Sequence, residues 1–282
     1  MSEFLILAAG ILWGTMGIFV KQITAIGFSP VEASALRWIF ASLIISIYAL
    51  IFNRGSLIIK PKDIWKFAFI GVFSTLLMSS LFYISITYTS IAVSDILMYT
   101  SPVWVQIASV VFFKEKLKPK KIVCVLLAFF GCVFVSGIFS AGKITVSGLG
   151  IICGLGAGIS YASYSIAGKY MLKKYSDITL TVYNVIFAGI AAIFTINPCK
   201  LIDKLIIKPM SVIYILAIAI LCTVVPYFLY TVGLKRTEAS RAAIICCIEP
   251  IVATVGSVFI AHEFFRFFRQ SASDWWFYLS FY

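Results

Sequence analysis

The chain has 282 residues, of which 62% are hydrophobic and 12% charged, and its mean hydropathy is +1.05. A soluble globular domain is roughly half apolar and about a quarter charged, so a soluble fold would have no core large enough for these side chains. A lipid bilayer accepts them. The apolar runs are long and continuous, unlike the alternating strands of about 10 residues in a membrane barrel. The sequence therefore predicts an all-α membrane protein.

The formal net charge of +12 is compatible with a nucleic-acid partner, but cytoplasmic loops of membrane proteins are also rich in Lys and Arg. We therefore expect no nucleic acid. The seven cysteines show no paired spacing and His262 is the single histidine, which predicts neither a disulfide framework nor a metal site. The sequence lacks the phosphate-binding pattern GxxxxGK[ST] and an acid–base set. We expect no enzyme activity and no cofactor.

Nine apolar segments are predicted to be helices, most of them close to the roughly 20 residues that cross a bilayer. They cover residues 3–22, 32–52, 64–86, 90–112, 122–138, 147–170, 178–196, 211–233 and 239–261. With the N-terminus inside, the inner connections carry about twice as many Lys and Arg as the outer ones. The residues 200–208 are an outer connection that weakens this bias. We expect a multi-pass protein of the cell membrane with a cytoplasmic N-terminus.

The two halves of the sequence align without a gap over several segments when one is shifted by 148 residues. Matched pairs include Lys21 and Lys169, Leu81 and Leu229, Thr89 and Thr237, Pro102 and Pro250, and Glu115 and Glu263. The first four predicted helices match the sixth to the ninth, an offset of five helices. Because five is an odd number, the second copy enters the membrane from the opposite side. Such inverted repeats are typical of secondary transporters, whose substrate site lies near the midplane between the copies.

Four segments also carry a family pattern. They are LAAGILWGTMGIFVKQI (7–23), SPVEASALRWIFASLII (29–45), YTSIAVSDILMYTSPVWVQIASVVFFKEKL (88–117) and LKRTEASRAAIICCIEPIVATVGSVFIAHE (234–263). They resemble the EamA-type members of the drug/metabolite transporter superfamily. The resemblance implies ten helices in an inverted 5+5 repeat and the export or exchange of small metabolites by alternating access. It assigns residues 1–140 to the first repeat and 147–263 to the second.

The resemblance stops near the end of the chain. A counterpart of the fifth helix, KIVCVLLAFFGCVFVSG (121–137), should begin near residue 269, where RQSASDWWFYLSFY stands instead. We therefore expect about nine transmembrane helices, with the tenth absent or altered, and a divergent aromatic tail at 264–282. A shifted reading frame would produce such a tail. Alternatively, its Trp and Tyr side chains lie at the headgroup level.

Glu249 is the first candidate for a functional charge, because ionisable groups inside membrane helices are costly. It precedes Pro250, and prolines such as Pro250 and Pro102 kink helices and free carbonyls that can line a cavity. Glu249 would hold a cation, a proton or a substrate amine; the alternative is a structural carboxylate bonded to a neighbouring helix. Its counterpart is Ser101, which makes the two copies unequal at the candidate site.

Two further charges lie in predicted helices. Arg37 would contact an anionic substrate group. In the interpretation that we favour, its side chain instead extends to the membrane interface, where the guanidinium stays hydrated. Asp95 is either a gate residue or a hydrated helix end.

The resemblance also places six aromatic side chains on helices that face the cavity: Trp13, Tyr83, Tyr99, Tyr161, Tyr227 and Tyr230. Their apolar faces and polar edges suit the transient binding of amphipathic metabolites and cations. Packing between helices is the alternative role for each ring.

The sequence therefore predicts a secondary active transporter, an exporter or exchanger of small metabolites such as amino acids or amphipathic compounds. The alternative is a non-transporting or defective membrane protein that lacks its last helix. Its expected partners are a small-molecule substrate and the lipid bilayer, and a homodimer is an open alternative.

Overall fold

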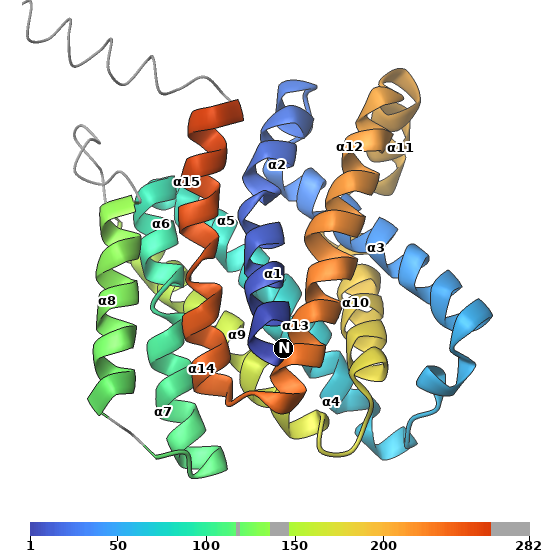
Figure 1. The fold of residues 1–282 in the computed structure, drawn as a ribbon. Helices are drawn as coiled ribbons and strands as arrows, with labels where there is room; N and C mark the ends of the chain where they lie inside the picture. Colours follow the sequence, from blue (N-terminus) through green and yellow to red (C-terminus); the bar gives the residue numbers. More distant parts are fainter. Residues whose placement is uncertain (117–118, 136–146, 261–282) are drawn as a thin grey trace, which may run out of the picture.

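The computed structural model describes residues 1–116, 119–135 and 147–260, and this part of the chain is helical with no strand (Figure 1). The helices of the first half are α1 (Ser2–Gly14), α2 (Met16–Ala25), α3 (Pro30–Phe52), η1 (Arg54–Leu57), η2 (Pro61–Asp63), α4 (Ile64–Phe69), η3 (Ile70–Leu77), α5 (Met78–Tyr88), α6 (Ile91–Met98), α7 (Ser101–Phe113) and α8 (Pro119–Val135). Those of the second half are α9 (Gly148–Met171), α10 (Asp177–Ile193), α11 (Pro198–Ile207), α12 (Met210–Ala219), η5 (Ile220–Val224), α13 (Val225–Arg236), α14 (Ala239–Cys246) and α15 (Glu249–Ile260). The prediction of an all-helical protein is confirmed for these residues.

Within the described residues, six helical segments are long and apolar enough to cross a bilayer: Ser2–Ala25, Pro30–Phe52, Pro61–Tyr88, Val93–Phe113, Gly148–Met171 and Met210–Arg236. Each coincides with one of the nine predicted helices. The helix Asp177–Ile193 is also apolar but shorter, as is Lys121–Gly131. The total of nine spans stays a prediction, and the aromatic tail at 264–282 lies outside the described residues.

Two predicted helices are broken, although the sequence predicted each as one continuous element. Residues 90–112 form α6 and α7, separated at Tyr99 and Thr100. Residues 239–260 form α14 and α15, separated at Cys247 and Ile248. Pro102 and Pro250 are each the second residue of the new helix rather than a kink inside a continuous one. Proline suits this position, because the first N–H groups of a helix have no partner within it.

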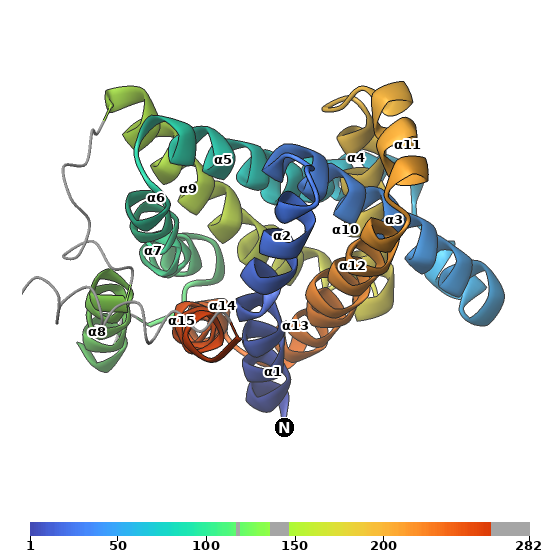
Figure 2. The ribbon, with the colours of Figure 1, turned by 90° about the horizontal axis from the view of Figure 1, so that it is seen from above.

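The helix bounds agree with the offset of 148 residues in the sequence. Shifted by that number, α6 coincides with α14, the start of α7 with the start of α15, and the π-helical segment η3 overlaps η5. The packing is reciprocal as well. Helix α1 packs against α13, α14 and α15, helix α9 against α5, α6 and α7, and α3 against α10 (Figure 2).

Two glycines at equivalent positions allow the close helix contacts of this arrangement. A Cβ atom on Gly10 would lie 2.6 Å from the side chain of Ile248, and one on Gly158 would lie 2.9 Å from that of Thr100. Both distances are shorter than van der Waals contact, so α1 and α9 approach the two helix breaks in the same way.

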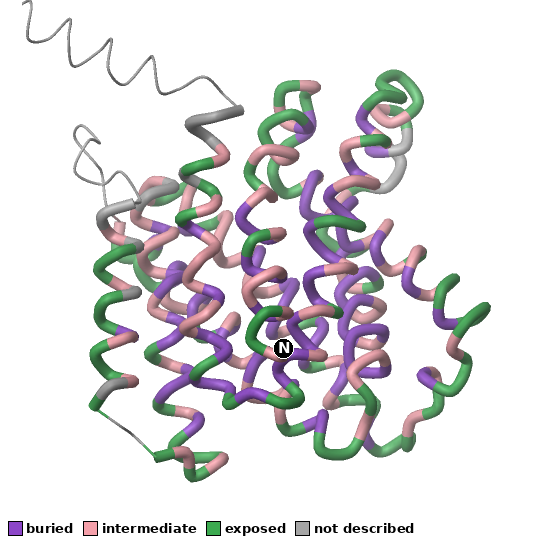
Figure 3. Tube along the Cα trace, viewed as in Figure 1, coloured by how far each residue is buried: buried purple, intermediate pink, exposed green. Residues whose placement is uncertain are grey.

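The buried residues concentrate where α1, α9, α10 and α13 meet, whereas α8 and the end of α3 are mainly exposed (Figure 3). Large apolar side chains on the outer faces, such as Leu50, Phe52, Leu127 and Phe130, are exposed. Such an exterior is expected of helices that face lipid.

Candidate functional site

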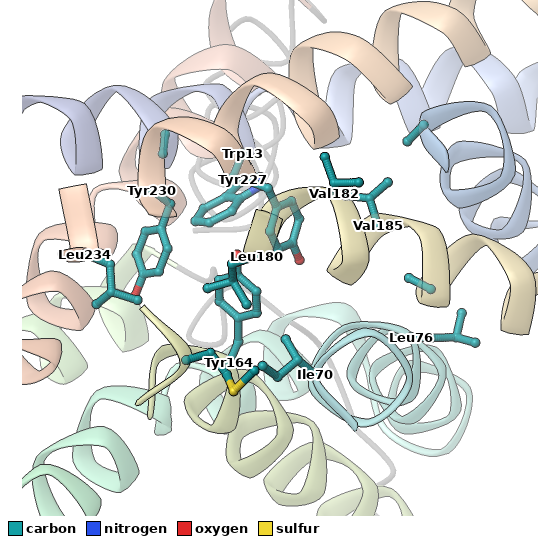
Figure 4. Close-up of a cluster of buried hydrophobic side chains, with 14 of the residues drawn as sticks. Trp13, Ile70, Leu76, Tyr164, Leu180, Val182, Val185, Tyr227, Tyr230 and Leu234 are labelled. Atoms are coloured by element: carbon teal, nitrogen blue, oxygen red, sulfur yellow. The ribbon is translucent and has the colours of Figure 1, made fainter. Parts of the chain in front are cut away.

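Four aromatic side chains form the centre of the molecule (Figure 4). Trp13 comes from α1, Tyr164 from α9, and Tyr227 and Tyr230 from α13. The ring centroid of Trp13 lies 5.1 Å from that of Tyr227 and 5.5 Å from that of Tyr230, and Tyr164 lies 5.1 Å from Tyr227. These separations are typical of interacting aromatic pairs. We call these four residues the central aromatic cluster.

Glu249 lies beside this cluster and is joined to it by Tyr161. The Tyr161 hydroxyl donates a hydrogen bond to Glu249 Oε2 at 3.4 Å, and the Tyr161 ring lies 6.4 Å from that of Trp13. Glu249 is the first residue of α15, at the break after α14, and not in a helix interior as the sequence indicated. Its carboxylate therefore lies at the break between two helices, where backbone groups are free to contact a ligand.

The Trp13–Gly14 pair explains how α1 reaches this position. A Cβ atom on Gly14 would lie 2.7 Å from the backbone oxygen of Glu249 and 2.7 Å from Cβ of Val252. Only a residue without a side chain allows this approach. Gly14 thus brings α1 against the start of α15, while Trp13 enters the central aromatic cluster.

Arg37 does not extend to the membrane interface, so our favoured interpretation is wrong. The residue is 6% exposed, with its guanidinium 4.7 Å from the Trp38 ring. One terminal nitrogen contacts Met16 Sδ, and the other is 3.5 Å from Ser79 Oγ. Packing between α2, α3 and α5 retains the charge inside the protein. Its Nε has no hydrogen-bond partner among the described residues.

Asp95 is the third charged residue that the sequence singled out, and it lies on α6. It is half-buried, in a helix that packs against α9, the helix that carries Tyr161. Its role as a gate residue or as a hydrated helix end stays a prediction.

The remaining predicted residues lie at different distances from this site. Tyr99 is buried at the α6–α7 break, in a small apolar cluster against which Tyr161 packs. Ser101 is buried as the first residue of α7. Tyr83 instead lines a separate cavity of about 250 Å³ with Ser34, Ser80 and other residues of α3 and α5. The structure does not bring Tyr83 to the central aromatic cluster.

Three polar residues of the interior were missed by the sequence analysis. Tyr164 belongs to the central aromatic cluster and shares a hydrogen bond of 2.9 Å with Thr231. Gln106 is buried in α7 with neither amide atom bonded to a described residue, and Asn184 in α10 has an unbonded Nδ2. An amide within an apolar run was the available signal, because such groups are costly in a membrane helix.

The described residues contain no group of three His, Cys, Asp or Glu side chains that could hold a metal ion.

The sequence matches the model of the EamA-like transporter family in two consecutive segments, residues 1–137 and 148–270. The chain belongs to the EamA-like transporter family. The family resemblance inferred from the sequence is thereby confirmed, and the chain is a member of a family of membrane transporters.

Other EamA-like proteins align over nearly the whole chain. A protein of Archaeoglobus fulgidus named as an uncharacterized transporter is 25% identical over 264 residues, which cover 93% of this chain and 91% of the relative. The uncharacterized transporter YwfM of Bacillus subtilis is 26% identical over 273 residues, covering 96% and 87%. A solved crystal structure superposes with a TM-score of 0.75 at 15% identity, covering 92% of this chain and 88% of that one. This last similarity shows the fold.

Proposed function

We propose that this EamA-like protein is a secondary active transporter that exports or exchanges small metabolites, such as amino acids or amphipathic compounds, by alternating access. The observation that carries the proposal is the position of Glu249. It lies at the break between α14 and α15, bonded to Tyr161 and beside the central aromatic cluster. Secondary transporters commonly bind their substrates at such interrupted helices.

The chemistry of these side chains indicates the class of substrate. A carboxylate attracts an ammonium group, and the faces of Trp13, Tyr227 and Tyr230 favour both apolar surface and cations. Arg37 supplies a buried positive charge on α3, and the ring of its neighbour Trp38 lies 5.5 Å from that of Tyr227. A compound with an amine, an apolar part and a carboxylate would satisfy all three features, and an amphipathic amine would satisfy the first two.

The architecture that we propose is an inverted repeat with a cytoplasmic N-terminus in the cell membrane. The reciprocal packing of α1 with α13–α15 and of α9 with α5–α7 supports two equivalent units. The excess of Lys and Arg in the inner connections supports the orientation. Movement of one unit against the other would then expose the site to each side of the membrane in turn.

Flux through liposomes that contain the purified chain tests the proposal. We expect accumulation or counterflow of at least one labelled amino acid or amphipathic amine. The variant Glu249→Gln should lower this flux at least tenfold, because it removes the charge and keeps the shape of the side chain.

The matched control is Asp203→Asn, which neutralises an exposed carboxylate on α11. Its flux should equal that of the natural chain. Equal flux for Glu249→Gln would exclude Glu249 from the mechanism, whereas no flux for a broad panel of amino acids and amines would contradict transport itself.

A further inference from the structure

A second cavity, of about 520 Å³, lies away from the candidate transport site, at one end of the helices. It is formed where the chain enters the segment Pro61–Tyr88 and where it leaves Gly148–Met171. Its lining residues are Lys62, Asp63, Trp65, Lys66, Tyr170, Met171, Lys173 and Lys174. Four lysines against one aspartate make it strongly positive. The volume is within the range of about 300–1,000 Å³ that is typical of small-ligand sites.

Two of these lysines are held in place by a buried carboxylate. Asp63 is 2% exposed and accepts a hydrogen bond from Tyr175 Oη at 2.7 Å. Lys66 Nζ lies 3.0 Å from Asp63 Oδ1, and Lys174 Nζ bonds to Oδ2. This hydrogen bond to Asp63 raises the pKa of Lys174 above its ordinary value. One negative charge thus orders two positive ones.

The other two lysines leave the cavity with an uncompensated positive charge. Lys62 and Lys173 are exposed, and neither has a carboxylate partner within residues 1–116, 119–135 and 147–260. The Lys173 ammonium lies 5.2 Å from the centre of the Phe113 ring. An anion that enters the cavity would therefore meet ammonium groups ordered by Asp63, from Lys66 and Lys174, and two that no carboxylate neutralises, from Lys62 and Lys173. Lysine ammonium groups are common ligands of phosphate.

The rim of the cavity is aromatic and faces outward. Trp65 is 63% exposed and Tyr170 is 56% exposed, and Lys66 Nζ lies 5.8 Å and 5.5 Å from the centres of their rings. Ile64 beside them is also exposed. Exposed Trp and Tyr at the end of a membrane segment belong at the headgroup level. A small soluble anion has no apolar part that could contact this rim, whereas a lipid has acyl chains that could pack against it.

We propose that this cavity binds the phosphate headgroup of an anionic phospholipid, with the four lysines around the phosphodiester and the acyl chains along Trp65 and Tyr170. Basic cavities between membrane helices on the cytoplasmic side are suited to such headgroups. A bound lipid would connect the chain before α4 to the turn after α9. This inference does not depend on the transported substrate.

Native mass spectrometry of the purified full chain tests this site. We expect phosphatidylglycerol to bind at least fivefold more tightly than phosphatidylcholine with the same acyl chains. The double variant Lys62→Gln/Lys173→Gln should weaken phosphatidylglycerol binding at least tenfold, because it removes two of the four ammonium groups that line the cavity. This variant retains Asp63 and its three partners, so the local fold should persist.

The matched control is Lys116→Gln/Arg236→Gln, which removes the same charge from two exposed positions outside the cavity. Its phosphatidylglycerol affinity should be that of the natural chain. An equal loss in the control, or no loss in the lysine variant, would overturn the proposal. Displacement of the lipid by millimolar inorganic phosphate would assign the cavity to a soluble anion and overturn the lipid assignment.

Discussion

Arg37 carries a positive charge in the interior of the protein. A guanidinium near the end of an apolar helix is expected to reach for water, yet Arg37 lies between Met16, Trp38 and Ser79. No carboxylate in the described part of the chain forms an ion pair with it. A buried charge without an ion-pair partner is costly, and in membrane helices such groups mark substrate or ion pathways. We infer that Arg37 serves transport rather than stability.

The variant Arg37→Met separates these two roles. We expect the unfolding temperature in detergent to change by less than about 4 °C, because an apolar side chain of similar volume often replaces a buried charge at little cost. Flux should fall at least tenfold. The control Arg54→Met removes an exposed guanidinium and should leave flux unchanged. A large loss of thermal stability with normal flux per folded molecule would assign a structural role to Arg37.

At the scale of elements, the contact between α1 and α15 depends on Gly14. We expect Gly14→Ala to lower the unfolding temperature by about 2–10 °C, because the added methyl would meet backbone and Cβ atoms of α15 at 2.7 Å and overpacking costs about 1–3 kcal/mol. Flux should fall as well, since the start of α15 carries Glu249. Thermal unfolding and flux in the same preparation measure both effects.

Gly17→Ala is the control for this prediction. A Cβ atom on Gly17 has no neighbour within 4 Å, and the residue lies within α2. The alanine should leave the protein unchanged or raise its stability by up to about 1 kcal/mol, because alanine is the better helix former. Equal effects of the two substitutions would show that Gly14 acts through helix propensity rather than through the contact with α15.

The elements that were predicted well are those whose length and apolarity determine them. The predicted helix 32–52 became Pro30–Phe52, and 147–170 became Gly148–Met171. The breaks at Tyr99–Thr100 and Cys247–Ile248 were missed because hydropathy does not report backbone hydrogen bonds. The amphipathic helix α11 was predicted as a connection, because its lysines lower the hydropathy of the segment. One face of α11 is nevertheless apolar and packs against the core through Leu201.

The candidate site was predictable in its residue types and less so in its geometry. Trp13, Tyr161, Tyr227, Tyr230 and Glu249 lie together, and the sequence had singled out all five. Tyr83 lies elsewhere because a helix carries side chains on every face, and the family pattern alone does not resolve which face meets the site. Tyr164 was missed for the same reason, although it lies one helical turn from Tyr161.

At the scale of the whole molecule, one polar network joins the two halves at the end that we propose is cytoplasmic. Glu115 follows α7 and accepts a hydrogen bond from the backbone N–H of Ala239 at 3.2 Å and another from Ser240 Oγ. Lys121 contacts Glu115 Oε2 at 3.4 Å and Glu238 Oε2 at 2.7 Å. Glu115 thus holds the start of α14, immediately before the helix break that leads to Glu249.

If the two halves move against each other during transport, this network closes the cytoplasmic side and has to open. The variant Glu115→Ala removes charge-assisted hydrogen bonds, each of which contributes about 1.5–3 kcal/mol. We expect it to shift the population toward a state that is open to the cytoplasm by about tenfold or more. Cys246, which is buried next to the break, then becomes the reporter of opening.

The opening is measured by the rate at which a membrane-impermeant maleimide, added from the cytoplasmic side, alkylates Cys246. Peptide mapping distinguishes the alkylation of Cys246 from that of Cys247. The rate should rise about tenfold in Glu115→Ala and stay unchanged in Glu3→Ala, which removes only an exposed ion pair to Arg241. A rise that also occurs when the reagent is added from the other side would indicate general loosening. An unchanged alkylation rate and normal flux in Glu115→Ala would mean that the network is not a gate. A network that has to open during transport should open more often when the Glu115 carboxylate is removed.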